Sequence, residues 1–319
     1  MDSKSEHDDG WHKDLVERLA SDALIERRRA RRWGIFFKLL TFAYVTLLLV
    51  LALPSGWTDK AIKDKGHTAL IELKGVIAAD EKASASNVIE GLRDAFEDDG
   101  TKAVILRINS PGGSPVQSSD IYKEILRLRK KYPDIPLYAV VSDMCASGGY
   151  YIASAADKIY VNESSVIGSI GVLMNGFGFV DTMGKLGVER RLMTAGEHKG
   201  ILDPFSPLSE FDRRYIGDLL TGLHRTFIDA VKAGRGDRLK GDDETLFSGL
   251  FWNGKEGIEL GLADAIGNAS YVAREVVGAE DLVDFTSKED PIERLVNRLG
   301  AAAGQALARV AGFGQVELR

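Results

Sequence analysis

Cysteine and histidine are both scarce in this chain. Cys145 is the only cysteine in 319 residues, so the chain forms no internal disulfide and no metal site made of cysteines alone. Of the five histidines, only His67, His198 and His224 follow the long apolar run described below, and no pair of them has the spacing of a metal-binding motif such as HExxH. A zinc enzyme is therefore not expected, and we predict no metal site.

Excess positive charge is absent as well. Lysine and arginine number 41 against 47 aspartates and glutamates, and the formal net charge is −6. The one dense basic block lies at residues 27–32, so we expect no nucleic-acid partner, which would require a broad basic face. Hydrophobic residues make up 45% of the chain, which is enough to build a sizeable core.

One long apolar run stands near the N-terminus. Residues 39–53 carry no charge, and the run extends back to Trp33 with only Lys38 interrupting it. This length predicts a transmembrane helix over residues 33–54. A cleaved signal peptide is the competing interpretation, but a long polar segment precedes the run and no A-x-A-like site follows it. The arginines at 27–32 predict a cytoplasmic N-terminus and place the larger C-terminal part on the other side of the membrane.

The chain thus divides into five predicted parts. They are a cytoplasmic segment over residues 1–32, the membrane helix over 33–54, a linker over 55–66, a large folded domain over 67–286 and an amphipathic tail over 287–319.

Short β-rich runs alternate with helical patterns through the predicted domain. This alternation predicts an α/β fold with a mixed sheet and flanking helices. A strand is expected at residues 189–195. A long helix is expected from Ser209, its N-cap, to just before Gly234, because apolar residues recur at every fourth position between them.

Ser147 is the first residue that could carry chemistry. The segment Cys145-Ala-Ser-Gly-Gly-Tyr150 joins an apolar strand to an apolar helix, so Ser147 lies near a helix N-terminus among small residues. The amide of Gly148 would then point out of the helix start, where it could stabilise an oxyanion. The alternative is that Ser147 is a simple N-cap.

A turn rich in glycine could provide a second amide. In Asn109-Ser-Pro-Gly-Gly-Ser114, between a predicted strand and a predicted helix, the amide of Gly113 could lie beside that of Gly148 and complete an oxyanion hole. A Pro-Gly-Gly turn is also common for purely structural reasons, so the turn alone is not specific.

A candidate general base lies in the polar loop Gly196-Glu-His-Lys-Gly200. A lysine can act as a base only if it loses its proton near neutral pH, which requires desolvation or a neighbouring positive charge. Lys199 would need such surroundings, whereas most loop lysines are solvated. Ser169 could hydrogen-bond and aim the amine of Lys199, or it could be a simple turn serine.

Together these motifs resemble a known family. NSPGGSP at 109–115, SDMCASGGYYIASAAD at 142–157, VIGSIGV at 166–172, GEHKGILDPFSP at 196–207 and LFSGLFWNGKEGIELGLADAIG at 246–267 occur in the order found in bacterial signal peptide peptidase A, in its short, single-repeat form. The resemblance spans about residues 67–270. It implies the fold shared by the Clp protease proteolytic subunit and the crotonases.

The resemblance also implies roles for individual residues. Ser147 matches the nucleophile and Lys199 the general base, while Ser169 matches the serine that orients the lysine. Gly113 and Gly148 match the oxyanion-hole residues. Cys145 is a departure, because the family typically has a less reactive residue at this position.

The function implied is that of a membrane-anchored serine endopeptidase that uses a Ser/Lys dyad and no cofactor. Its expected substrates are remnant signal peptides and other short apolar peptides. Its expected location is the bacterial inner membrane, with the catalytic domain on the periplasmic side. A ring-like homo-oligomer is also implied, in which Ser147 and Lys199 could come from adjacent subunits.

Three alternatives remain open at this point. A crotonase-like acyl-CoA hydratase or isomerase would use the same pair of amides, although coenzyme A thioesters are cytoplasmic and the predicted topology places the domain outside. A non-catalytic membrane scaffold would leave Ser147 inert. A Ser/His arrangement through His198 is also compatible with the positions of these residues in the chain.

Overall fold

The computed structural model describes residues 26–29, 31–46 and 66–287 of the chain. The chain separates into two units, one made of Met1–Trp57 with Asp290–Arg319 and the other of Thr58–Glu289. The described part of the first unit is helical over residues 26–29 and 31–46. The predicted tail is described for residue 287 only, and the predicted linker for residue 66 only.

The predicted membrane helix is described only in part. Across residues 26–29, 31–46 and 66–287, we find no helix that combines the length and the apolar character needed to cross a membrane. Residues 47–54 of the predicted span, and residues 1–25 of the segment before it, lie outside the described residues.

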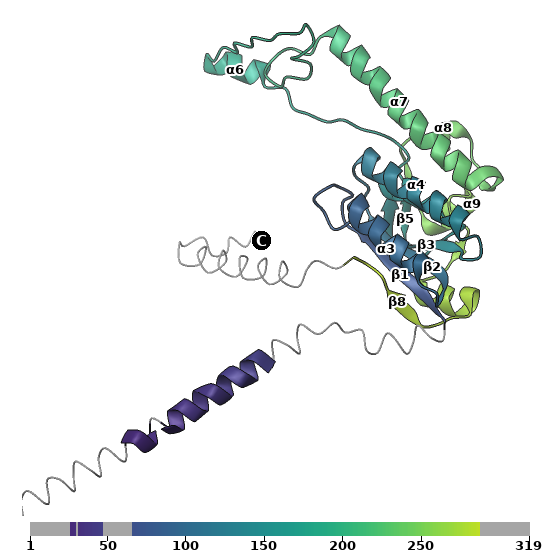
Figure 1. The fold of residues 1–319 in the computed structure, drawn as a ribbon. Helices are drawn as coiled ribbons and strands as arrows, with labels where there is room; N and C mark the ends of the chain where they lie inside the picture. The colour runs from purple at the N-terminus through teal and green to yellow at the C-terminus, as the bar shows by residue number, and fades with distance from the viewer. Residues whose placement is uncertain (1–25, 30, 47–65, 288–319) are drawn as a thin grey trace, which may run out of the picture. The chain divides into compact units, whose positions relative to one another are not determined.

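The second unit is built on one mixed sheet (Figure 1). The strands run in the order β6-β5-β3-β2-β1-β8, and β4 pairs with both β3 and β7. All pairs are parallel except β5 with β6. The strands are β1 (His67–Lys74), β2 (Thr101–Ser110), β3 (Leu137–Ala146), β4 (Lys158–Val161), β5 (Val166–Gly168), β6 (Phe251–Asn253), β7 (Ala265–Ile266) and β8 (Leu282–Asp284).

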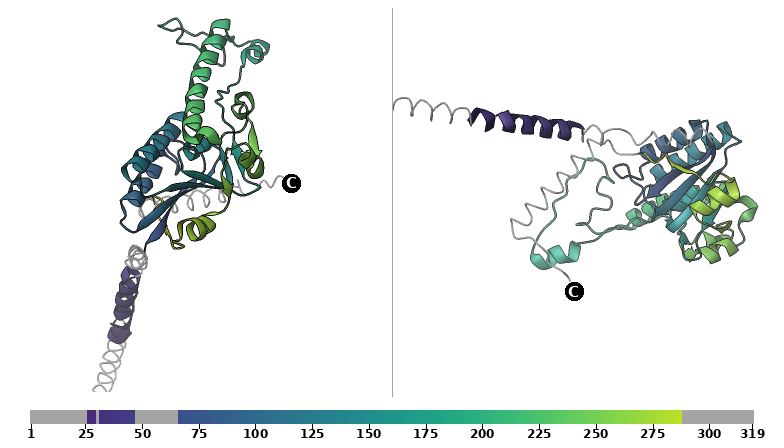
Figure 2. Two further views of the ribbon diagram at one scale, coloured as in Figure 1. Left: turned by 90° about the vertical axis from the view of Figure 1, so that its right-hand side faces the viewer. Right: turned by 90° about the horizontal axis from the view of Figure 1, so that it is seen from below.

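Helices cover both faces of this sheet, as two views of Figure 2 show. Alternate residues of a strand point to opposite faces, so Leu106 and Ile108 of β2 join the larger core while Ile105 joins the smaller one. The larger core includes residues of α3 (Ala85–Glu97), α4 (Pro115–Lys131), α5 (Gly148–Ala153) and the end of α7 (Glu210–Arg235). The smaller core includes residues of α10 (Ala269–Tyr271) and η2 (Val272–Val277). The predicted mixed α/β architecture is confirmed.

Local sequence explains where the main helices begin. The Ser84 hydroxyl accepts a hydrogen bond from the Asn87 amide at the start of α3, and Ser114 does the same for Gln117 at the start of α4. Pro115 occupies the first turn of α4, where its missing N–H has no cost. The remaining short elements are α6 (Val180–Leu186), η1 (Gly236–Arg238), α8 (Asp243–Leu246) and α9 (Gly254–Glu259).

The predicted long helix is confirmed as α7, and Ser209 with Asp212 forms a reciprocal capping box at its start. The predicted end was wrong, because α7 continues to Arg235 and Gly236 is its C-cap. Gly234 lies inside the last turn because the helix contacts α5 there. A Cβ atom at Gly234 would lie 1.9 Å from the Ser154 carbonyl oxygen.

The predicted strand over residues 189–195 was wrong. These residues form no regular element, and Met193 is 93% exposed. They belong to a segment that we call the arm, residues 171–226, all of which the structure describes and none of which is buried. A strand needs a hydrogen-bonding neighbour, and no strand of the described sheet pairs with residues 189–195.

Glu124 on α4 links this helix to α3 and makes the free energy of unfolding depend on pH in the acid range. Its carboxylate accepts hydrogen bonds from Arg127 on the same helix and from Arg93 on α3. The Arg127 bond, opposed by partial burial and reinforced by Arg93, holds the pKa of Glu124 at about 2, below its ordinary value of 4.5. Because the folded pKa is the lower one, the stabilisation is complete above pH 4.5 and is lost as the pH falls toward 2.

We therefore expect Glu124→Gln to lower the urea midpoint of unfolding at pH 6 more than at pH 3. The difference between the two midpoints should shrink as the pH falls, because protonation removes the same charge from the wild-type side chain. Exposed Glu244→Gln is the matched control. A midpoint difference that stays constant from pH 6 to pH 3 would contradict the assigned role.

Candidate active site

Ser147 occupies the sharp turn between β3 and α5. Its backbone has φ 51° and ψ −122°, which is unusual for a residue with a side chain. The Ser147 amide donates to the Gly168 carbonyl at 2.8 Å, and the Ser147 carbonyl accepts from the Tyr151 amide at 2.9 Å. These two bonds hold the strained turn between β5 and the first turn of α5.

The hydroxyl of Ser147 does not cap the helix that follows it. Other helices of this protein do have a serine whose hydroxyl caps the helix, so Ser147 differs from the N-cap serines of its own chain. These are Ser84, Ser114 and Ser209. Ser147 is half-buried, and its hydroxyl makes no hydrogen bond to any described residue. The geometry therefore disfavours the simple N-cap interpretation and leaves this hydroxyl available for chemistry.

The amide of Gly113 points toward the same corner. Ile77 forms a parallel bridge with Gly113 by bonding its neighbours: the Ile77 amide donates to the Gly112 carbonyl, and the Ser114 amide donates to the Ile77 carbonyl. Because successive amides of an extended chain alternate in direction, the N–H of Gly113 points away from Ile77. A Cβ atom on Gly148 would lie 3.3 Å from the Gly113 nitrogen, so the two glycines are adjacent.

Two amides therefore meet beside the Ser147 side chain. Gly148 is the first residue of α5, where no helical carbonyl is available to its N–H. Neither the Gly113 nor the Gly148 amide donates a hydrogen bond within the part of the chain that the structure describes. A pair of free amides beside a serine hydroxyl is the arrangement that stabilises an oxyanion.

Glycine is required at these positions by close packing. A Cβ atom on Gly112 would lie 2.7 Å from both the Ser147 Cβ and the Gly148 nitrogen, and its φ of +98° is itself unfavourable for other residues. A Cβ atom on Gly148 would lie 2.4 Å from the Ser118 hydroxyl of α4. The missing side chains allow the turn, the nucleophile and α4 to pack together.

Ser169 lies next to this corner on the neighbouring strand. Ala146 of β3 pairs with Gly168 of β5, so the residues that follow, Ser147 and Ser169, leave the sheet side by side. Ser169 also has a positive φ of 50°, and its amide donates to the Leu250 carbonyl at 2.7 Å. The structure thus brings Ser147, Gly148, Gly113 and Ser169 together.

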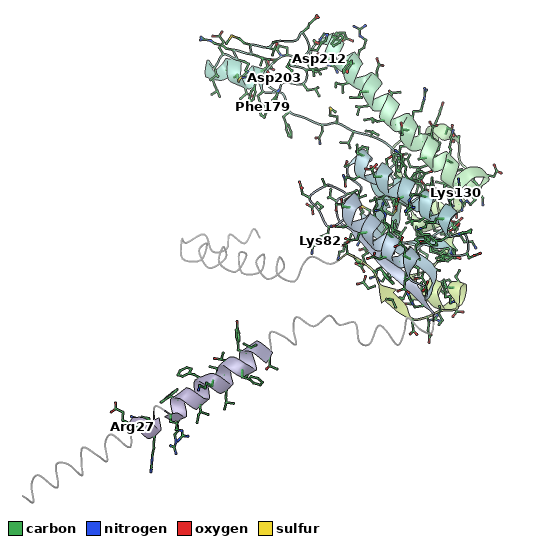
Figure 3. The ribbon with its side chains drawn as sticks, in the orientation of Figure 1. Arg27, Lys82, Lys130, Phe179, Asp203 and Asp212 are labelled. Carbon is green, nitrogen blue, oxygen red and sulfur yellow. The ribbon has the colours of Figure 1, made fainter. Side chains whose placement is uncertain are left out.

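The structure does not bring Lys199 to this corner within one chain. Lys199 is exposed on the arm, and the ring of its neighbour His198 stacks on Phe211 at the start of α7, with ring centroids 4.1 Å apart. His224, further along α7, bonds the carbonyl of Ile170, which follows Ser169. At 1.5 Å per residue, Phe211 and His224 are about 20 Å apart along the helix. Figure 3 labels Phe179, Asp203 and Asp212 in this outer part of the arm.

Burial changes the acidity of two side chains behind the nucleophile. Complete burial raises the pKa of the Cys145 thiol far above its ordinary value. Burial likewise raises the pKa of Tyr150, whose hydroxyl donates to the Leu262 carbonyl at 2.8 Å. Cys145 is thus a packed core residue despite its place two residues before Ser147, and its thiol stays protonated at neutral pH.

The sequence did not single out three residues that shape the site. They are Gly112 and Ser118, which pack against the corner, and Ile77, which bridges to Gly113. The glycine pair of the turn was a usable signal for Gly112. Ile77 precedes the turn by more than thirty residues, and only the bridge shows that it orients Gly113.

Among residues 26–29, 31–46 and 66–287, no cluster of three or more histidine, cysteine, aspartate or glutamate side chains could hold a metal ion.

Comparison with known proteins identifies the family. The sequence profile of peptidase family S49 matches residues 129–282, a range that contains Ser147, Ser169 and Lys199. A putative protease of Synechocystis is 30% identical over 253 residues, which cover 78% of this chain and 88% of that protein. The chain belongs to peptidase family S49, as the sequence motifs predicted.

Other relatives are much longer than the matched region. A putative signal peptide peptidase SppA of Enterococcus faecium is 32% identical over 209 residues, or 66% of this chain and 57% of that protein. The Na⁺/H⁺ antiporter NhaA of Brucella abortus is 44% identical over 196 residues, or 61% of this chain but 26% of the antiporter. The chain therefore spans only about a quarter of the antiporter and just over half of the Enterococcus protein.

We expect the Cys145 thiol to resist alkylation in the folded protein. Its complete burial and raised pKa both suppress the reactive thiolate, so iodoacetamide labelling should be at least about a hundredfold slower than in the urea-unfolded chain. Mass spectrometry of intact protein measures the rate, and Ser164→Cys, at an exposed position, is the control for reagent access. Rapid labelling of Cys145 in the folded protein would show that β3 and α5 are not packed as described.

Proposed function

We propose that the protein is a serine peptidase that cleaves peptide bonds through an acyl-enzyme, with Ser147 as nucleophile and Lys199 as general base. The observation that carries the proposal is the strained turn at Ser147, whose uncapped hydroxyl lies beside two free amides. Membership of peptidase family S49 supports this assignment.

The proposed mechanism uses the groups of this corner together with Lys199. Ser147 Oγ attacks the carbonyl carbon of the scissile bond, while neutral Lys199 accepts the hydroxyl proton. The amides of Gly113 and Gly148 donate hydrogen bonds to the oxyanion that forms. The tetrahedral intermediate collapses, the C–N bond breaks, and Lys199 returns the proton to the leaving amine. Water then hydrolyses the ester with Lys199 again as base, and Ser169 orients the lysine amine.

Lys199 is proposed to act on Ser147 of an adjacent copy. Within one chain, His198 beside Lys199 stacks on Phe211, whereas His224 bonds the residue after Ser169. About 20 Å of α7 lies between these two contacts. A general base must come within about 3 Å of the proton that it accepts. A neighbouring subunit that places its arm over Ser147 would supply the base and would also shield the lysine from water.

The surface of the arm supports a homo-oligomer. Its most exposed large apolar side chains are Leu173, Phe177, Leu186 and Met193, which are 80, 82, 73 and 93% exposed. Along α7, an apolar stripe stays exposed although the His198 ring covers one end of it at Phe211. Its members are Phe211, Tyr215, Leu219 and Leu223. Apolar surface of this extent is typical of protein interfaces.

The substrates and location proposed are those that the sequence motifs implied. Apolar peptides such as remnant signal peptides would bind as extended strands, and a helix over residues 33–54 would anchor the catalytic domain on the periplasmic side of the bacterial inner membrane. The putative SppA of Enterococcus faecium, which is named for signal peptides, supports this substrate class.

The crotonase alternative is disfavoured by membership of a peptidase family, and a non-catalytic scaffold would not require the strain at Ser147. The Ser/His alternative has the same geometric difficulty as a dyad within one chain, because His198 lies beside Lys199 on the arm.

The dyad requires both Ser147 and Lys199. Ser147→Ala and Lys199→Ala should each lower the rate of hydrolysis of a fluorogenic apolar peptide by at least about a thousandfold, since each removes a reacting group. Mixed oligomers of the two variants should recover part of the wild-type rate, because some interfaces then contain both groups. Verified mixed oligomers without recovery would contradict a shared dyad.

His198→Ala separates the two candidate bases. It removes the ring beside Lys199 but leaves the amine, so we expect a rate within about tenfold of the wild type. If the rate instead falls as far as that of Ser147→Ala while the oligomer persists, His198 is the base.

Gly112→Ala tests the close packing of the corner. The added methyl group would meet Ser147 and the Gly148 amide at 2.7 Å, so it should displace the oxyanion donors. We expect kcat to fall about a hundredfold with little change in KM, as when an oxyanion donor is lost. Gly176→Ala is the control, because a Cβ atom there would meet nothing within 4 Å. Unchanged kcat in Gly112→Ala would separate this turn from catalysis.

A further inference from the structure

The end of α7 that follows the arm, residues 227–235, contains buried side chains, whereas the arm contains none. We call residues 227–235 the root of the arm. On α7, Phe227, Ala230, Val231 and Arg235 are buried, whereas no residue before Phe227 on this helix is. The last nine residues of α7 therefore hold a helix of 26 residues to the rest of the unit, and Figure 1 shows the remainder extending away from the sheet.

Arg235 is the centre of this root. Its side chain has no exposed surface. The guanidinium donates twice to the Gly261 carbonyl, at 3.0 and 2.8 Å, and twice to the Asp264 carboxylate, at 2.7 and 3.0 Å. A planar group with four hydrogen bonds fixes both position and rotation, which a single contact does not.

Asp264 connects this clamp to the sheet. Its carboxylate also accepts a hydrogen bond from the Ile159 amide of β4, at 2.7 Å, and Arg238 lies 3.6 Å away. Burial opposes ionisation of Asp264, but the hydrogen bonds from Arg235 and Ile159 outweigh it, so its pKa lies below the ordinary value. The ion pair therefore persists at neutral pH.

Further contacts place the root against the nucleophile helix. The Tyr122 hydroxyl of α4 donates to the Ala230 carbonyl at 3.1 Å, and the Phe227 ring lies 4.9 Å from that of Tyr151 on α5. Gly234 packs against the Ser154 carbonyl at the end of α5. The direction of α7 is thus set relative to the helix that begins after Ser147.

A small change in the angle of α7 at the root produces a larger displacement at the far end of the helix. Phe227 and Phe211 are sixteen residues apart, or about 24 Å along the helix axis. A tilt of about 5° at the root would move the far end by about 2 Å, which is comparable with the length of a hydrogen bond. A misplacement of about 1 Å in a catalytic group can cost about a hundredfold in rate.

A gain in the free energy of unfolding is a weak explanation for the buried Arg235–Asp264 ion pair. Buried ion pairs are often no more stabilising than apolar residues of similar volume, because desolvation offsets the attraction. What the pair provides here is a defined angle between α7 and the sheet.

We propose that Arg235 is a positioning residue for catalysis: by fixing the root of α7, it determines where the arm delivers Lys199 on the adjacent subunit. This inference rests on the proposed function, because it requires Lys199 to act in a neighbouring copy. It assigns to Arg235 an effect on the active site of the neighbour and not on that of its own chain.

Mixed oligomers of the full chain test this directionality. One subunit carries Ser147→Ala and therefore donates only Lys199, while the other carries Lys199→Ala and donates only Ser147. Arg235→Lys, which keeps the charge but not the four-bond geometry, is added to one type of subunit at a time. Peptide hydrolysis then gives kcat and KM for each mixture.

We expect at least about a tenfold loss of kcat, with KM unchanged, when Arg235→Lys is in the Lys199-donating subunit. In the Ser147-donating subunit the same substitution should leave kcat within about twofold. Equal losses in both positions would show a purely structural role and overturn the inference, as would no loss in either. Arg225→Lys is the matched control, because Arg225 is exposed on the same helix.

The two proposals fail in different ways. If the mixture without any change at Arg235 recovers no activity, the shared dyad itself fails. If that mixture is active and Arg235→Lys shows no directionality, only the positioning role fails. Should Arg235→Lys prevent assembly, Tyr122→Phe loosens the same root by removing one hydrogen bond, and the same asymmetry is expected.

Discussion

The left-handed turn at Ser147 is the constraint on which the active-site corner depends. A serine at φ 51° costs of order 1–3 kcal/mol, and the surrounding structure must supply that energy. It does so through the bond from the Ser147 amide to Gly168 and through the burial of Gly148 and Tyr150 just beyond it. The Ser147 hydroxyl leaves the helix start uncapped. Gly112 can approach Ser147 only because it lacks a side chain, and Gly113 can bridge to Ile77 for the same reason.

Much of the fold and of this corner could be predicted from the sequence, because local patterns encode them. The alternation of β-rich and helical patterns located β2 and α4, and a capping residue located the start of α7. Runs of small residues located the turns at Gly113 and Ser147. The end of α7 was misplaced because glycine has two uses: Gly236 ends the helix, whereas Gly234 allows close packing against α5. A one-dimensional pattern does not distinguish them.

The errors and omissions concern long-range pairing. Residues 189–195 were predicted as a strand, but no strand among the described residues pairs with them. Ile77 contributes only through a bridge to a distant turn. Arg235 drew no attention in the sequence, since a single arginine near a helix end is ordinary. Its importance arises from Gly261 and Asp264, which the chain brings back to it after more than twenty residues.

The separation of Lys199 from Ser147 has a consequence for the life of a newly made chain. Under the proposed mechanism, a solitary subunit carries a formed oxyanion corner while its own Lys199 lies out of reach, so this separation itself keeps the subunit latent. Encounter with further copies is then the activation step, and activity would rise more steeply than protein concentration. A peptidase of this design is inactive while it is dilute and incompletely assembled.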